Sequence, residues 1–180
     1  MYIGGRSAPL LYSSDGQVNA ILPLGITANT STQVIVTRGN QYSVPVDIVI
    51  APAAPGVFAT AGNGQGQGFI YSGGKLANSA SPAKAGDTLV MYASGLGSLD
   101  SAVDDGAAPP PRLIQTVDPV TVKIGGITAL TTYAGVAPGL AAGLYQVNAI
   151  VPAGVTPGDQ VPVLLSVAGH SSPAVTMSVR

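Results

Sequence analysis

The chain has 180 residues and a formal net charge of −1, and only 8% of its residues are charged, against about 25% in an average globular domain. This balance excludes the basic surface that nucleic-acid binding requires. The absence of cysteine excludes disulfides, thiolate metal sites and a cysteine nucleophile. The 24 glycines and 15 prolines in a chain that is 46% hydrophobic are typical of short strands joined by tight turns. We therefore predict an all-β sandwich.

Segments rich in β-branched residues that end at Gly, Pro or Asn predict the strands in chain order. They are residues 8–12, 17–22, 32–38, 44–50, 68–72, 87–93, 119–124, 127–134, 143–151, 161–168 and 173–179. Strands 32–38 and 44–50 should form one hairpin, and strands 161–168 and 173–179 another, with Gly39 and Gly169 at positive φ in their turns. Residues 51–58 contain two prolines and predict a stiff connector.

Two parts of the chain share the same sequence. Gln17–Pro23 returns 129 residues later as Gln146–Pro152, with one Leu-to-Val difference. Ile3-Gly4-Gly5 returns after 121 residues, at 124–126, so the second copy holds eight extra residues between these motifs. Such a repeat predicts two copies of one structural unit. We place a partial first unit at residues 1–56 and a complete second unit at residues 57–180.

The first copy lacks a segment that precedes the second. The second copy follows a predicted strand, Asp87–Ala93, and a long Asp- and Pro-rich loop, whereas the first copy starts almost at the chain's first residue. A half unit leaves an apolar sheet face and a strand edge uncovered. We expect residues 57–78 or another copy of the chain to cap it, so a homo-oligomer formed through the first unit is one expected state.

The order of Ile-Gly-Gly, Tyr, Gln-Val-Asn-Ala-Ile-Val-Pro and a glycine-turn hairpin, together with Ala54–Phe58 and Pro82–Asp87, resembles the uncharacterised Solibacter-type C-terminal domain family. That family lies at the ends of large exported acidobacterial proteins and is similar in plan to immunoglobulin-like units of the IPT/TIG kind. The resemblance implies tandem immunoglobulin-like β-sandwiches, the first incomplete at its N-terminus. It also implies an extracellular or cell-surface location, although the chain opens without a signal-peptide pattern. It implies no reaction.

Motifs for catalysis are weak. Ser81-x-x-Lys84 has the spacing of penicillin-recognising enzymes, but the chain lacks their Ser-Asp-Asn and Lys-Thr-Gly motifs. His170 is the only histidine and falls in a predicted turn, with no second histidine for a metal or a triad. The apolar stretch 44–61 contains an aspartate and three prolines, which excludes a membrane helix. We expect no catalytic site, no cofactor and no membrane insertion.

Acidic residues gather in one loop. Asp100, Asp104 and Asp105 supply carboxylates of the kind that calcium prefers, but their spacing does not match a regular calcium loop. The alternative is an ordinary solvated loop, which we favour.

Amide side chains recur in the repeated motif. Gln17 and Asn19, and likewise Gln146 and Asn148, lie two residues apart and therefore share one face of a strand. They could form a platform for a ligand, or they could bond to nearby backbone and fix the strand end. We favour the structural role.

Two functions remain open. The first is a non-catalytic structural or adhesive module of a larger exported bacterial protein, which binds a protein or a cell-surface polymer. The second is a carbohydrate- or surface-ligand-binding module that accompanies an enzyme or adhesin. Sugar platforms usually display exposed Trp or Tyr, and this chain has no Trp, seven Tyr and two Phe. The composition favours the first function.

Overall fold

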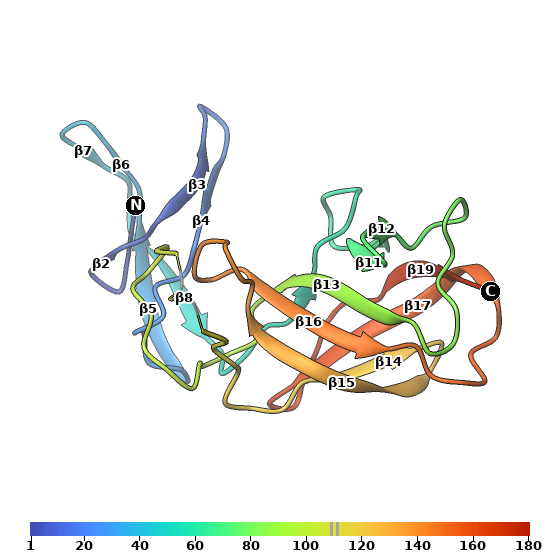
Figure 1. Cartoon of the computed structure of the whole chain (residues 1–180). Helices are drawn as coiled ribbons and strands as arrows, with labels where there is room; N and C mark the ends of the chain where they lie inside the picture. Colours follow the sequence, from blue (N-terminus) through green and yellow to red (C-terminus); the bar gives the residue numbers. More distant parts are fainter. Residues whose placement is uncertain (109, 111) are drawn as a thin grey trace.

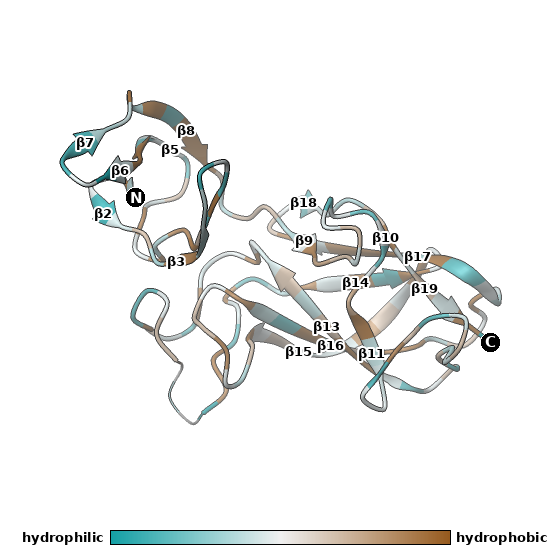
Figure 2. Ribbon diagram, turned by 90° about the horizontal axis from the view of Figure 1, so that it is seen from above, coloured by the Kyte–Doolittle hydropathy of each residue, from teal (hydrophilic) through white to brown (hydrophobic). Residues whose placement is uncertain are grey.

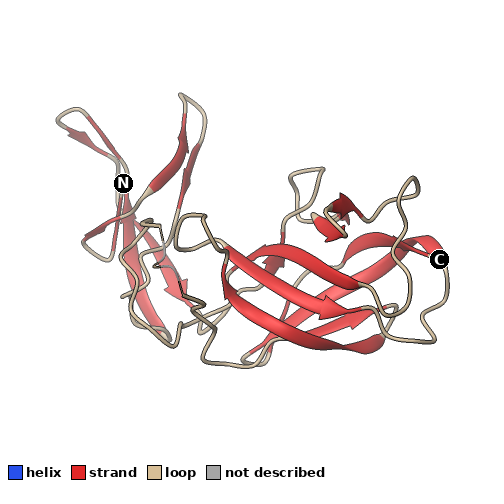
Figure 3. Ribbon diagram, viewed as in Figure 1, coloured by secondary structure: helices blue, strands red, loops and turns tan. Residues whose placement is uncertain are grey.

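Figure 1 presents the computed structural model of the protein, which describes residues 1–108, 110 and 112–180. Every regular element in these residues is a strand, and they contain no helix (Figure 3). The predicted all-β, sandwich-like fold is therefore confirmed. The many glycines serve the turns between strands: Gly39 and Gly169, expected at positive φ, have φ of 58° and 78°.

The N-terminal region, residues 1–50, consists of short strands. They are β1 (Tyr2–Ile3), β2 (Arg6–Ser7), β3 (Leu10–Ser13), β4 (Val18–Ala20), β5 (Thr30–Ile35), β6 (Thr37–Arg38), β7 (Gln41–Tyr42) and β8 (Val46–Ile50). One sheet has the order β2-β1-β5-β8, while β3-β4 and β6-β7 form separate two-stranded hairpins. In Figure 1 the β3-β4 and β6-β7 hairpins both project upward from this sheet.

The C-terminal region, residues 56–180, holds an 11-stranded sheet with the order β10-β19-β17-β14-β15-β16-β13-β11-β12, joined by β18 on β17 and β9 on β13. Its strands are β9 (Gly56–Val57), β10 (Gly66–Gln67), β11 (Ile70–Ser72), β12 (Lys75–Leu76), β13 (Thr88–Ser94), β14 (Thr121–Ile124), β15 (Ile127–Val136), β16 (Tyr145–Ile150), β17 (Gly158–Val167), β18 (His170–Ser171) and β19 (Val175–Val179). The long strand β15 pairs with β14 through its first residues and with β16 through the rest. It therefore joins two layers, one formed by β19, β17 and β14 and the other by β16, β13 and β11.

The core lies between these two layers. Along β13, the buried residues Leu89, Met91 and Ala93 alternate with partly exposed or exposed neighbours, as expected for a strand with one inward face. β16 and β17 show the same alternation around Val147 and Leu165. Among the described residues, the large hydrophobic core cluster consists of side chains of the C-terminal region together with Ala53 just before it.

Every strand predicted from the sequence overlaps an observed strand, and both predicted hairpins are present as the β5-β8 and β17-β19 pairs. The predicted connector at residues 51–58 is wrong at its end. Gly56 and Val57 form β9 and pair with Ser94 and Ala93, because the chain must return to the edge of β13 there.

The repeated sequences form strands that pair in the same register. At the sequence offsets of the repeat, each of three residue pairs in the N-terminal region has a counterpart in the C-terminal region. The strand pair β3-β4 and its counterpart β15-β16 each contain a register shift at the equivalent place. The equivalent pairs are Ile3–Val34 and Ile124–Val163, Tyr12–Asn19 and Tyr133–Asn148, and Val34–Val46 and Val163–Val175.

Residues 57–78 do not cap the N-terminal region, which corrects one of the two alternatives expected from the sequence. β9 and β11 pair with β13, and β10 pairs with β19, so this segment completes the C-terminal sheet. The reason is that β13 has two edges and β16 occupies only one of them. The other alternative, a cap supplied by another copy of the chain, stays a prediction.

Candidate functional site

The N-terminal region leaves apolar side chains in water. Figure 2 shows hydrophobic residues along β8 in the N-terminal region. Val46 on this strand is 60% exposed, whereas its counterpart Val175 is fully buried. Tyr12 is 52% exposed and its counterpart Tyr133 only 8%. Most of the exposed large hydrophobic residues of the protein lie here, namely Tyr2, Leu10, Leu11, Tyr12, Leu22, Val36, Tyr42, Val44, Val46 and Val49.

The difference arises from one missing neighbour. In the C-terminal region, β16 lies between β15 and β13 and pairs with both. In the N-terminal region, the equivalent strand β4 pairs with β3 alone, within the part of the chain that the structure describes. No strand takes the place of β13 there. We call the following surface the open face: the side of β4 away from β3, together with Val36 and Val46, whose counterparts Leu165 and Val175 are buried.

A cleft of about 1160 Å³ runs along the open face. One wall comes from β4 and the residues that follow it, another from the end of β8 and the connector after it, and a third from the loop that contains Ser98–Asp105. Clefts of this size exceed the usual volume of a small-molecule pocket. The cleft therefore has room for a segment of polypeptide.

Three contacts hold the cleft's walls together. The backbone N–H of Leu24 donates a hydrogen bond of 2.7 Å to Oδ1 of Asp105, and Arg6 Nη2 lies 3.5 Å from Oδ2 of the same carboxylate. Ile21 packs against the loop before β16 so closely that a Cβ at Gly143 would lie 2.3 Å from the Ile21 Cγ2 atom. The N-terminal region is thus anchored to the loops of the C-terminal region.

The three aspartates suggested for calcium have separate partners. Asp105 binds Leu24 and Arg6, as described above, and the Asp100 carboxylate accepts the backbone N–H of Gln115 at 3.2 Å. In the described residues, no group of three or more His, Cys, Asp or Glu side chains could hold a metal ion. The loop carbonyl of Asp104 accepts a backbone hydrogen bond from Ala107. The structure therefore does not bring these carboxylates together.

The amide pairs bond within each pair. Gln17 Nε2 donates to Asn19 Oδ1 at 2.6 Å, and Gln146 Nε2 donates to Asn148 Oδ1 at 2.9 Å. Within the part of the chain that the structure describes, neither pair forms the bonds to loop backbone that the structural interpretation supposed. Both lie on the outer face of their strands, and each amide keeps further hydrogen-bonding capacity that a ligand could use.

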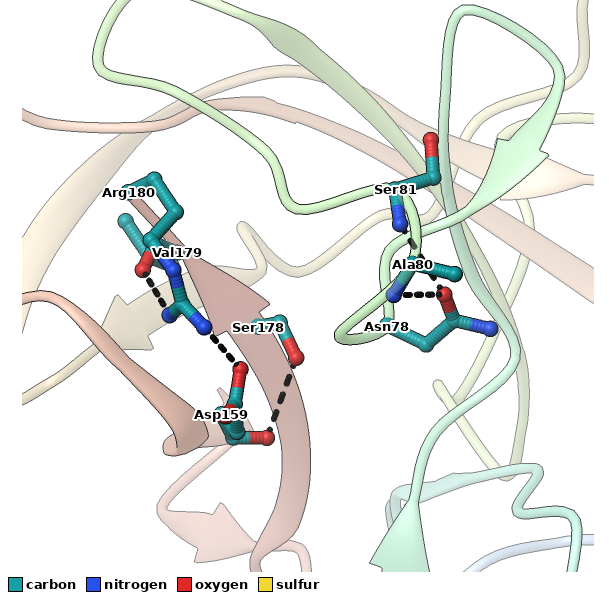
Figure 4. A network of polar contacts seen from close by, with 7 residues as sticks. All are labelled: Asn78, Ala80, Ser81, Asp159, Ser178, Val179 and Arg180. Carbon is teal, nitrogen blue, oxygen red and sulfur yellow. Dashed lines mark hydrogen bonds and ion pairs between the residues drawn. The ribbon is translucent and has the colours of Figure 1, made fainter.

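The residues weighed for catalysis, Ser81 and His170, lie in a turn and on a strand, respectively. Ser81 follows a turn in which Asn78 Oδ1 accepts the backbone N–H groups of Ala80 and Ser81, so its segment is not helical (Figure 4). Figure 4 also shows the Arg180 guanidinium on the Asp159 carboxylate, a contact that ties the last strand to β17. His170 is exposed on β18, opposite Val167.

The structure reveals an aromatic hollow that the sequence did not indicate. It is a concave surface of about 250 Å³ lined by Phe58, Phe69, Tyr71, Tyr92, Leu140 and Leu144. Tyr71 and Tyr92 meet edge to face, with ring centroids 6.0 Å apart. Both leucines come from the stretch between β15 and β16 that holds the eight extra residues of the second copy. This insertion was the sequence feature that could have pointed to the hollow, because it has no equivalent in the first copy.

Two buried tyrosines of the C-terminal region bond through their hydroxyls to backbone carbonyls. Burial raises the pKa of Tyr145 to about 12, and its hydroxyl donates to the carbonyl of Gly97 at 2.7 Å. Burial and, to a lesser degree, the nearby Asp100 raise the pKa of Tyr133, whose hydroxyl bonds to the carbonyls of Val136 and Ile114. Both hydroxyls are therefore neutral structural donors.

No family model, no curated protein and no solved structure matches the chain. The resemblance to the Solibacter-type domain therefore rests on its sequence motifs alone. Within the described residues, no helix is long and apolar enough to cross a membrane.

Proposed function

We propose that the chain is a non-catalytic structural or adhesive module of a larger exported bacterial protein, built from tandem immunoglobulin-like units of which the first is incomplete. Its N-terminal unit holds another polypeptide through the open face. The observation that carries the proposal is the contrast between Val46 and Val175, which are equivalent in sequence and register but are exposed and buried, respectively. Large exposed apolar patches mark interaction surfaces.

The experiment is an adhesion assay with beads that carry the whole chain. The beads are presented to surfaces coated with the same chain, with a denatured and alkylated protein, or with dextran. We expect adhesion to one or both polypeptide surfaces, and a several-fold loss with Val46→Lys, because the charge would lie on the open face. Val44→Lys is the matched control, since Val44 is 82% exposed and its counterpart in the C-terminal region, Pro173, is also exposed, whereas Val46 corresponds to the buried Val175. Adhesion to dextran alone, or no effect of Val46→Lys, contradicts the proposal.

The aromatic hollow favours a second function, the binding of a carbohydrate or another surface ligand. Tyr92 lies directly opposite Gln146 on the neighbouring strand, so an apolar ring surface and an amide share one face of the sheet. Sugars are bound by this combination of ring stacking and hydrogen bonds.

Titration of the whole chain with neutral oligosaccharides, followed by NMR, tests this second function. We expect shifts at the hollow that are lost with Tyr92→Ala and kept with Tyr42→Ala, since Tyr42 is exposed elsewhere on the surface. An absence of shifts at millimolar ligand would rule the second function out.

A further inference from the structure

We propose that β4 accepts an extended strand from another polypeptide, which pairs antiparallel to Val18–Ala20 and inserts apolar side chains at alternate positions into the open face. This inference rests on the proposed function and specifies the partner. It would be a case of strand addition at a sheet edge, in which backbone hydrogen bonds give affinity and side-chain pockets give specificity.

The C-terminal region provides the template for this pairing. There, β13 runs antiparallel to β16 over six residue pairs, with Leu89 opposite Ala149 and Met91 opposite Val147. The sequence Gln-Val-Asn-Ala-Ile is the same in β16 and around β4. The incoming strand should therefore place one apolar residue opposite Ala20 and a second apolar residue, two positions further along, opposite Val18.

The geometry of β4 suits this partner. Val18 and Ala20 lie on one face of the strand and are only partly buried, whereas Asn19 lies on the other face and is exposed. The equivalents of Val18 and Ala20 in β16 are fully buried, and Met91 and Leu89 lie directly opposite them on the neighbouring strand β13. The cleft runs along this edge, so an added strand would fill existing space.

The chain cannot supply the strand from its own β13. That strand pairs with β16 on one side and with β9 and β11 on the other, and its inward side chains are fully buried. A second copy of the chain has its β13 engaged in the same way. Donation would require the C-terminal region to unfold, which favours an extended segment of a different polypeptide as the occupant.

The pattern of β13 defines the chemistry of that segment. It carries apolar residues at every second position, Leu89, Met91 and Ala93, and one acidic residue just before the strand, Asp87. A partner segment needs the same alternation over at least the length of β4. By the template of the C-terminal core, the apolar positions would face Val36 and Val46, because the counterparts Leu165 and Val175 lie in one core cluster with Leu89 and Met91. Burial of apolar area there stabilises the complex.

The test uses the whole chain and a synthetic peptide with the sequence of residues 86–95. Binding is measured by fluorescence anisotropy, and amide hydrogen exchange reports where the peptide lies. We expect saturable binding and slower exchange at the amides of β4. A control peptide with aspartate at the positions of Leu89 and Met91 should not bind, because charged side chains would enter an apolar face.

Two variants of the chain sharpen the test. Val18→Lys should weaken binding about tenfold or more, whereas Val44→Lys should leave it unchanged. If Val18→Lys does not fold, the exchange pattern of the unaltered chain still decides the question. Saturable binding without protection of β4, or no binding of the peptide, overturns the inference. Adhesion that persists in the bead assay while the peptide fails to bind would retain the proposed function and reject this partner.

Discussion

The N-terminal and C-terminal regions pair their strands in the same register, yet only one of them has a closed core. Ile3 opposite Val34 repeats as Ile124 opposite Val163, but Val46 lies in water while Val175 is buried. The repeated motif therefore determines strand pairing locally. Burial depends on strands that precede the motif in only one copy, chiefly β13. Matched substitutions in the two regions can separate these two contributions.

The largest expected effect is that of Val175→Ala set against Val46→Ala. The change in the C-terminal region removes two buried methyl groups and leaves a cavity, so it should lower the free energy of unfolding by about 2.5 kcal/mol. The same change at the exposed Val46 should lie within about 0.5 kcal/mol of zero. Urea denaturation measures both. Equal effects at the two positions would mean that the N-terminal region has a closed core in solution.

The second prediction concerns alkaline pH. Tyr145 has a pKa of about 12 in the folded protein and an ordinary value of 10.0 in the unfolded chain. Its contribution to stability is therefore complete below pH 10 and is lost as the pH rises towards 12, because the unfolded chain ionises first. The difference between the protein and Tyr145→Phe should change by roughly 2 kcal/mol over this range. Its counterpart by sequence offset in the first copy is Gly16, so the effect belongs to the C-terminal region alone.

Denaturation at several pH values between 8 and 12 provides the measurement. Tyr42→Phe, at an exposed position, should retain the pH dependence of the unchanged protein. A Tyr145→Phe variant that loses stability just as steeply would show that another group is responsible.

The third prediction compares two serines at equivalent positions. Ser172 Oγ accepts the buried backbone N–H of Leu165 at 3.0 Å, and Ser43 Oγ accepts the exposed N–H of Val36 at the same distance. Ser172→Ala leaves a buried donor without a partner and should destabilise the protein by about 1.5 kcal/mol. Ser43→Ala should have little effect, because water can replace the hydroxyl. Thermal denaturation of the two variants distinguishes a buried from a hydrated turn.

The smallest effect is expected where the two regions meet. Asp105→Ala removes the acceptor for the Leu24 N–H and should destabilise this junction by about 1 kcal/mol. Its ion pair with Arg6 adds little, since the arginine side chain is 51% exposed. Amide exchange at Leu24 should become faster, with Asp104→Ala as the neighbouring control. Unchanged exchange in Asp105→Ala would show that Ile21 and Gly143 hold the junction without it.

Much of the fold followed from the sequence because local signals decide strand positions. β-Branched alternation located strands such as β13 and β17, and glycines located turns such as the one at Gly169. The two-residue strands β1, β2, β7, β9, β10, β12 and β18 were not predicted, because so short a segment has no hydrophobic periodicity.

The sites were harder to predict because they depend on contacts between distant segments. The cleft needs β4, β8 and the loop at 98–105 in one place, and the aromatic hollow needs Phe58 beside Leu140. Nothing in the local pattern around Asp105 predicts its bond to Leu24. One of the two alternatives expected for the cap, residues 57–78, was wrong for the same reason, since both regions had an edge that could accept this segment.

The parallel pairing of β10 with β19 bears on how the chain folds during synthesis. Gly66 lies opposite Val175, so the sheet joins segments that leave the ribosome more than 100 residues apart. Such long-range pairing is slow to form because the loop between the strands must close first. The hairpins of the N-terminal region need only local contacts. They should form early, and their apolar face should stay exposed to water while the rest of the polypeptide is synthesised.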